Sequence, residues 1–90
     1  MIKQYNIRIF GQVQGVGFRY LGKTEADKLN ITGLIRNEPD GSVFIEAEGA
    51  RAELNKFIAW CKVGPSLAVV TKIEVTEGTP GGYTSFKISS

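Results

Sequence analysis

The first strand pattern constrains the fold most, because its residues alternate between apolar and polar. In residues 5–11, Ile7 and Ile9 fall on one face of an extended chain. Asn6 and Arg8 fall on the other face. A strand of this kind buries one face and is typical of an antiparallel sheet with one solvated side. A doubly wound parallel sheet, with strands that are apolar on both faces, is therefore disfavoured.

Periodicity and turn residues place the other elements. A helix is predicted at residues 50–62, where Leu54, Phe57, Ile58 and Cys61 recur at helical spacing. The remaining predicted elements are a helix over residues 18–29 and strands over residues 32–37, 42–48, 68–77 and 85–88. Asp40-Gly41 supplies the turn of a hairpin between the second and third strands.

The order β-α-β-β-α-β, with a short extra strand, predicts an α+β fold: a ferredoxin-like α/β sandwich. We expect an antiparallel sheet with two helices on one face, and one domain over residues 1–90. Alternation also predicts that Val69 faces the helices and that Glu48 faces solvent.

Composition narrows the chemistry. The chain has no histidine, the commonest general base and a frequent metal ligand, so catalysis would have to run without imidazole. Its formal charge of +2 suits a small anionic substrate better than nucleic acid. A single cysteine, Cys61, fits a reducing compartment and falls on an apolar helix stripe. No apolar stretch reaches membrane-spanning length. We therefore expect a cytoplasmic protein with no membrane or nucleic-acid partner.

Two phosphate-binding patterns overlap after the first strand. Residues 17–24, GFRYLGKT, fit the G-x-x-x-x-G-K-[ST] pattern of a nucleotide-binding P-loop. A P-loop follows a fully buried parallel strand, and the strand at residues 5–11 is apolar on one face only. At roughly 30 residues for each β-α-β unit, the chain is also too short for a large parallel sheet. Lys23 and Thr24 are therefore expected on a solvated helix face.

Residues 11–19, GQVQGVGFR, fit a shorter anion-binding loop. Gly11, Gly15 and Gly17 let backbone N–H groups approach a ligand, and the following helix points its positive N-terminus at the same place. Arg19 adds a guanidinium that can bind phosphate through two hydrogen bonds. On these residues alone, glycines that serve only a tight connection remain the more common explanation.

Longer motifs carry a family resemblance. Residues 9–19, IFGQVQGVGFR, resemble the first signature of the acylphosphatases, and residues 33–49, GLIRNEPDGSVFIEAEG, resemble their second. The second signature departs at Leu34, where the family usually has an aromatic residue, and at Ile35, where a smaller residue is usual. Residues 60–70 also resemble the family's helix-to-strand junction.

The resemblance implies hydrolysis of the carboxyl–phosphate bond of small acyl phosphates, giving a carboxylate and inorganic phosphate. Arg19 and Asn37 would be catalytic, with Asn37 orienting the attacking water. The phosphoryl group would be bound by Arg19 and by the loop residues Gln14, Gly15, Val16, Gly17 and Phe18. We expect no metal ion, no cofactor and a monomeric protein.

Topology brings these groups together. A β-α-β crossover leaves the first two strands parallel, so the loop at residues 11–19 and Asn37 are predicted at the same end of the sheet. With one strand between them, they would lie about 10 Å apart at strand spacing.

Two alternatives stay open. The first is a non-catalytic ferredoxin-like module that binds a small anionic ligand or RNA. RNA recognition by such a sheet uses stacking aromatic residues, and the strand SVFIEAE offers one, Phe44, beside two acidic residues. The second is an acylphosphatase-like module serving carbamoyl phosphate chemistry in hydrogenase-maturation proteins. Those modules are embedded in much longer chains, whereas we expect these 90 residues to form a complete unit.

Overall fold

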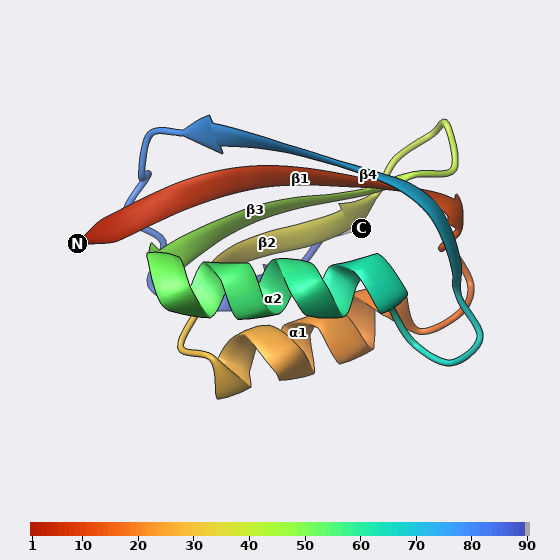
Figure 1. The fold of residues 1–90 in the computed structure, drawn as a ribbon, viewed down its shortest axis with the longest axis horizontal. Helices are drawn as coiled ribbons and strands as arrows, with labels where there is room; N and C mark the ends of the chain where they lie inside the picture. Colours follow the sequence, from red (N-terminus) through yellow and green to blue (C-terminus); the bar gives the residue numbers. More distant parts are fainter. Residues whose placement is uncertain (90) are drawn as a thin grey trace.

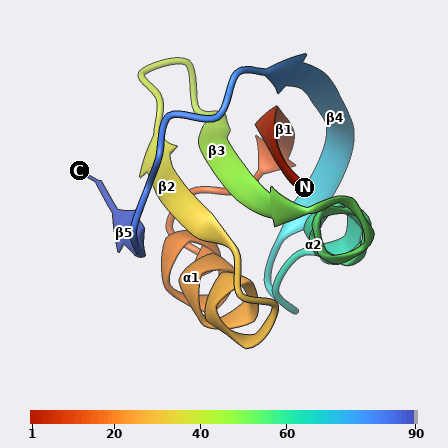
Figure 2. The same cartoon turned by 90° about the vertical axis from the view of Figure 1, so that its left-hand side faces the viewer.

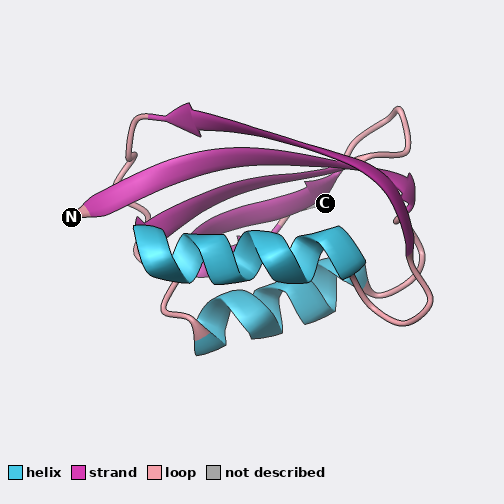
Figure 3. Cartoon of the chain, viewed as in Figure 1, coloured by secondary structure: helices cyan, strands magenta, loops and turns pink. Residues whose placement is uncertain are grey.

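A five-stranded sheet carries both helices on one face in the computed structural model, which describes residues 1–89 (Figures 1 and 3). The elements are β1 (Ile2–Gln12), α1 (Phe18–Lys28), β2 (Thr32–Asn37), β3 (Val43–Ala50), α2 (Arg51–Val63), β4 (Val69–Gly78) and β5 (Phe86–Ile88). Every predicted helix and strand is present, with small differences at the ends. The ferredoxin-like α+β arrangement is confirmed.

The sheet is mixed rather than wholly antiparallel. Its strand order is β4-β1-β3-β2-β5, with β5 parallel to β2 and all other pairs antiparallel. The expectation of an antiparallel sheet is wrong at this edge, because residues 79–85 carry the chain from β4 at one edge to β5 at the other (Figure 2). Since β1 and β2 both run antiparallel to β3, they are parallel to each other and end at the same end of the sheet, as predicted.

A bulge in β4 shifts the alternation of that strand. Phe10 pairs with Lys72 and Gly11 with Val70, so Thr71 is an extra residue in the ladder. As a result Val70 packs against the core, whereas Val69 is 53% exposed and the prediction that it faces the helices is wrong. Gly11 has a φ of +125°, and a Cβ there would come within 2.0 Å of the Val69 carbonyl oxygen.

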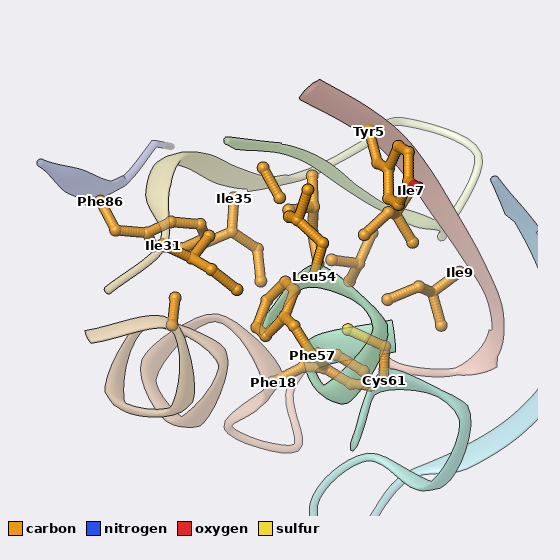
Figure 4. Packing of buried hydrophobic residues seen from close by; sticks show 14 of the residues in the cluster. Tyr5, Ile7, Ile9, Phe18, Ile31, Ile35, Leu54, Phe57, Cys61 and Phe86 are labelled. Atoms are coloured by element: carbon orange, nitrogen blue, oxygen red, sulfur yellow. The ribbon is translucent and has the colours of Figure 1, made fainter. Parts of the chain in front are cut away.

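The core lies between the sheet and the two helices. Figure 4 shows the strand side chains Ile7 and Ile9 on one side and Leu54 and Phe57 of α2 on the other, all fully buried. Cys61 is part of the same cluster, and burial raises the pKa of its thiol well above the ordinary range. Its predicted place in the core is therefore confirmed.

Phe18, the first residue of α1, fixes the start of that helix. Its ring is 2% exposed and packs edge-on against Trp60 of α2, with ring centroids 5.3 Å apart at 72°. An aromatic pair of this geometry adds about 0.5–1.5 kcal/mol beyond the area that it buries. The loop before α1 is thus joined to a rigid helix start.

The face of the sheet away from the helices is partly covered by the crossing segment at residues 79–85. Glu48 of β3 points to this face, as predicted, but it is 3% exposed rather than solvated. Its carboxylate accepts hydrogen bonds from the N–H groups of Gly81, Gly82 and Tyr83 and from Nε2 of Gln4. Desolvation acts to raise the pKa of Glu48, but these four donors outweigh it and hold the pKa below its ordinary value.

We predict that this carboxylate stabilises the fold in a pH-dependent way. Glu48→Gln should lower the free energy of unfolding by about 1–3 kcal/mol near neutral pH, because it weakens charge-assisted hydrogen bonds in a buried position. A depressed folded-state pKa contributes stability above the unfolded-state value of about 4.5, and that stability is lost as pH falls through the folded-state pKa. In urea unfolding, the difference in the free energy of unfolding between wild type and Glu48→Gln should therefore become smaller as the pH is lowered from about 7 to about 3.

The matched control is Glu77→Gln. Glu77 forms an ion pair with Lys3 at 3.2 Å, but its side chain is 56% exposed, so we expect a loss of at most about 1 kcal/mol. If the difference in the free energy of unfolding between wild type and Glu48→Gln does not change with pH, the ionised Glu48 carboxylate is not the source of the stability.

Candidate active site

The loop after β1 and the end of β2 meet at one end of the molecule, at the right in Figure 1. Arg19 follows the loop as the second residue of α1, and Asn37 is the last residue of β2. Both line one cavity of about 230 Å³. Its lining residues are Val13, Gly15, Gly17, Phe18, Arg19, Tyr20, Asn37 and Ile88. The predicted meeting of the loop with Asn37 is present in the structure.

The loop presents free backbone donors. Gly15 and Gly17 have φ angles of 74° and 83°, a left-handed conformation that turns successive N–H groups toward one side. Within residues 1–89, no N–H from Gln14 to Arg19 donates to another group of the chain. The first turn of α1 has no acidic residue and no side-chain cap. The partial positive charge of the helix start is therefore left for a ligand.

Arg19 is positioned from the far end of the chain. Its Nη1 donates to the Ser89 carbonyl oxygen at 3.3 Å, and the Ser89 N–H donates to the Ile35 carbonyl oxygen at 2.8 Å. No Asp or Glu of residues 1–89 forms an ion pair with Arg19. Sequence reasoning identified neither Ser89 nor Ile88 as part of this site, because nothing local in a three-residue strand indicates which strand it pairs with.

Asn37 stands at the start of a rigid hairpin. The Glu38 N–H donates to the Ser42 carbonyl oxygen at 2.8 Å, and the Asp40 carboxylate accepts from both the N–H and the hydroxyl of Ser42. The predicted turn at Asp40-Gly41 is confirmed, with Gly41 at a φ of +91°. The Asn37 side chain makes no hydrogen bond within residues 1–89, so its amide is free to contact a ligand or water.

Gln14 ties the loop to this hairpin. Its Nε2 donates to the carbonyl oxygens of Glu38 at 2.8 Å and Ser42 at 2.9 Å. Its side chain is therefore held away from the cavity, and any contact with a ligand falls to its N–H group. The Val16 side chain likewise packs against the core. Of the predicted phosphate-binding residues, Gly15, Gly17, Phe18 and Arg19 line the cavity.

The P-loop interpretation does not fit. Residues 18–24, which would have to wrap around a phosphate as a loop, lie in α1. Lys23 forms an ion pair with Asp27 at 2.8 Å on the exposed helix surface, and the Thr24 hydroxyl donates to the Tyr20 carbonyl oxygen. Both side chains are engaged locally.

The open sheet face near Phe44 is occupied by arginines. The guanidinium carbons of Arg8 and Arg36 lie 5.0 and 4.7 Å from the ring centroid, and both side chains pair with Glu38. A nucleic-acid base would have to compete with these cations for the ring.

No group of three or more His, Cys, Asp or Glu side chains within residues 1–89 is arranged to hold a metal ion. In the same part of the chain, none of the helices has the length and apolar character needed to cross a membrane.

Known proteins resemble the chain over almost all of its length. A family model described as acylphosphatase matches residues 5–88. An acylphosphatase of Thermotoga maritima is 47% identical over 87 residues, which cover 97% of each chain. The crystal structure of acylphosphatase from Bacillus subtilis has a TM-score of 0.95 at 43% identity and covers 100% of both chains. The crystal structure of T. kodakarensis HypF has a TM-score of 0.86 at 33% identity, covering 98% of this chain and 12% of HypF.

We predict that the tie made by Gln14 orders the loop for anion binding. Gln14→Ala removes two hydrogen bonds between the loop and the hairpin, so the dissociation constant for inorganic phosphate, measured by calorimetry, should rise about tenfold. Gln12→Ala is the matched control, because Gln12 is an exposed glutamine at the end of β1. Equal effects of the two substitutions would contradict the role of Gln14.

Proposed function

Because the chain belongs to the acylphosphatase family and is an acylphosphatase, we propose that Arg19 and Asn37 are its catalytic residues. An acylphosphatase hydrolyses the carboxyl–phosphate bond of small acyl phosphates. One observation carries the assignment of residues: Gly15 and Gly17, in a loop with free N–H groups, border the same cavity as Arg19 and Asn37.

The phosphoryl group binds at the loop. The N–H groups from Gln14 to Arg19 supply donors, and α1 directs its positive end to the same place. Arg19 adds a full positive charge from a guanidinium held in place by the Ser89 carbonyl oxygen. The charge spread over the equatorial phosphoryl oxygens in the transition state is met by donors already in position, and such preorganised electrostatics are usually the largest catalytic contribution.

Asn37 orients the attacking water. Its side-chain amide accepts a hydrogen bond from the water or donates one to it, and a neutral amide does not repel the phosphate as a carboxylate would. The water oxygen bonds to phosphorus as the bond from phosphorus to the acyl oxygen breaks, and a phosphoryl oxygen takes the proton. The carboxylate is a good leaving group and departs without protonation. A loose transition state asks little of the nucleophile, so no histidine is required.

These properties also make a metal ion and a cofactor unnecessary, and we propose that the enzyme uses neither. We further propose that residues 1–90 act as one domain and as a monomer in the cytoplasm, without a nucleic-acid partner. The lone cysteine supports a reducing compartment, and the arginines that occupy Phe44 argue against base stacking.

Turnover of benzoyl phosphate in the presence of a chelator tests the assignment. Arg19→Ala and Asn37→Ala should each lower kcat/KM by about 10²–10³, the usual effect of removing one group that stabilises or positions the transition state. Both side chains lie at the cavity rather than in the core, so circular dichroism spectra should match wild type.

Lys23→Ala is the control, since it removes an exposed cation from the same helix. Its activity should stay within about threefold of wild type, as expected for an exposed ion pair. Activity that survives the loss of Arg19, or that disappears with the chelator, would refute this account.

A further inference from the structure

The cavity has an apolar side that the phosphate-binding groups do not explain. Its polar side consists of the two loop glycines, Arg19 and Asn37, and the remaining lining residues are Val13, Phe18, Tyr20 and Ile88. At about 30 Å³ for each water molecule, 230 Å³ holds roughly seven waters, which is more space than a phosphate group of five heavy atoms fills. Val13 and Phe18 are only 1% and 2% exposed, so the exposed apolar surface beside the phosphate site comes from Tyr20 and Ile88.

Tyr20 is placed at this space by the helix that carries Arg19. Phe18 points into the core and is 2% exposed. Tyr20 lies two residues later, about 200° around the helix axis, so its side chain leaves the core side and is 69% exposed. An aromatic side chain is thus held at the mouth of the cavity by the packing of Phe18 against Trp60.

Ile88 reaches the same cavity from the edge of the sheet. It pairs with Ile35 in the parallel register of β5 on β2 and shares a face with Phe86. Phe86 is covered and 2% exposed, whereas Ile88 is 42% exposed. Single exposed apolar residues are ordinary on protein surfaces. Tyr20 and Ile88, however, lie 68 positions apart in the chain and border the same cavity.

We infer that Tyr20 and Ile88 form a subsite for the acyl group and favour acyl phosphates with an aromatic or branched apolar acyl group over acetyl phosphate. The inference rests on the proposed function, which places the phosphoryl group at the loop. An acyl group attached to that phosphoryl group extends into the remaining space, and there it contacts the two side chains. Removing on the order of 55 Å² of apolar surface from water corresponds to a tenfold gain in affinity. A phenyl ring carries several times the apolar surface of an acetyl methyl group, so contact with the two side chains favours the aromatic substrate.

The test compares the KM values of benzoyl phosphate and acetyl phosphate. Tyr20→Ala and Ile88→Ala should each raise KM for benzoyl phosphate about five- to tenfold and change KM for acetyl phosphate less than about twofold. Tyr20→Phe should behave as wild type, because the ring rather than the hydroxyl makes the contact. The inhibition constant of inorganic phosphate, which has no acyl group, should be unchanged in all variants, showing that the loop is intact.

Val75→Ala is the matched control, since Val75 is 40% exposed on β4 at the opposite edge of the sheet. It should leave the KM ratio of the two substrates unchanged. If wild type hydrolyses both substrates and the ratio is the same in Tyr20→Ala and Ile88→Ala, the subsite is overturned and the proposed function stands. If the inhibition constant of phosphate and both KM values rise together in Tyr20→Ala and Ile88→Ala, the two residues shape the loop. The subsite is then equally overturned. If wild type hydrolyses neither substrate, the proposed function itself fails.

Discussion

The pairing of β3 with both β1 and β2 is the constraint on which the site depends. Both neighbours run antiparallel to β3, so both end at the same end of the sheet. One of them leads into the glycine loop and the other finishes at Asn37. The hydrogen bonds from Gln14 to the Glu38 and Ser42 carbonyl oxygens then span the remaining gap. The geometry of the cavity therefore follows from backbone pairing, with the individual side chains adding adjustments.

The electrostatics of the cavity are those of an anion site without a counter-ion of its own. The acidic side chains near it are engaged elsewhere. Glu38 pairs with Arg8 and Arg36 on the other face of the sheet, and Asp40 is bound within its own turn, which holds its pKa below the ordinary value. Arg19 is positioned by a neutral carbonyl oxygen, so the guanidinium is held in place without a negative charge that would neutralise it. This distribution leaves the positive charge of Arg19 at the cavity without a neighbouring ion pair, which the proposed binding of a phosphate dianion requires.

Local patterns in the sequence predicted the elements and the meeting of the loop with Asn37, because alternation, helical spacing and the handedness of crossovers are local or topological rules. What they missed depends on contacts between distant segments. The bulge at Thr71 reverses which valine faces the core, and one extra residue leaves no mark on the pattern. Glu48 appears as a solvated residue until a glycine-rich segment, which has no periodicity, covers it. Ile88 and Ser89 belong to the site only because β5 pairs with β2. The catalytic roles of Arg19 and Asn37 remain predictions that rest on the family motif and the cavity.

The parallel placement of β5 has a consequence for how the protein is made. Synthesis proceeds from the N-terminus, so β1, α1, β2 and β3 are made before residues 86–89. The acceptor that holds Arg19 lies seventy positions further along the chain, and Ile88 is added just before it. A nascent chain that already contains the glycine loop and Asn37 is therefore still without one wall of its cavity and the anchor of its guanidinium. Assembly of this cavity is in this way coupled to the pairing of β5 with β2.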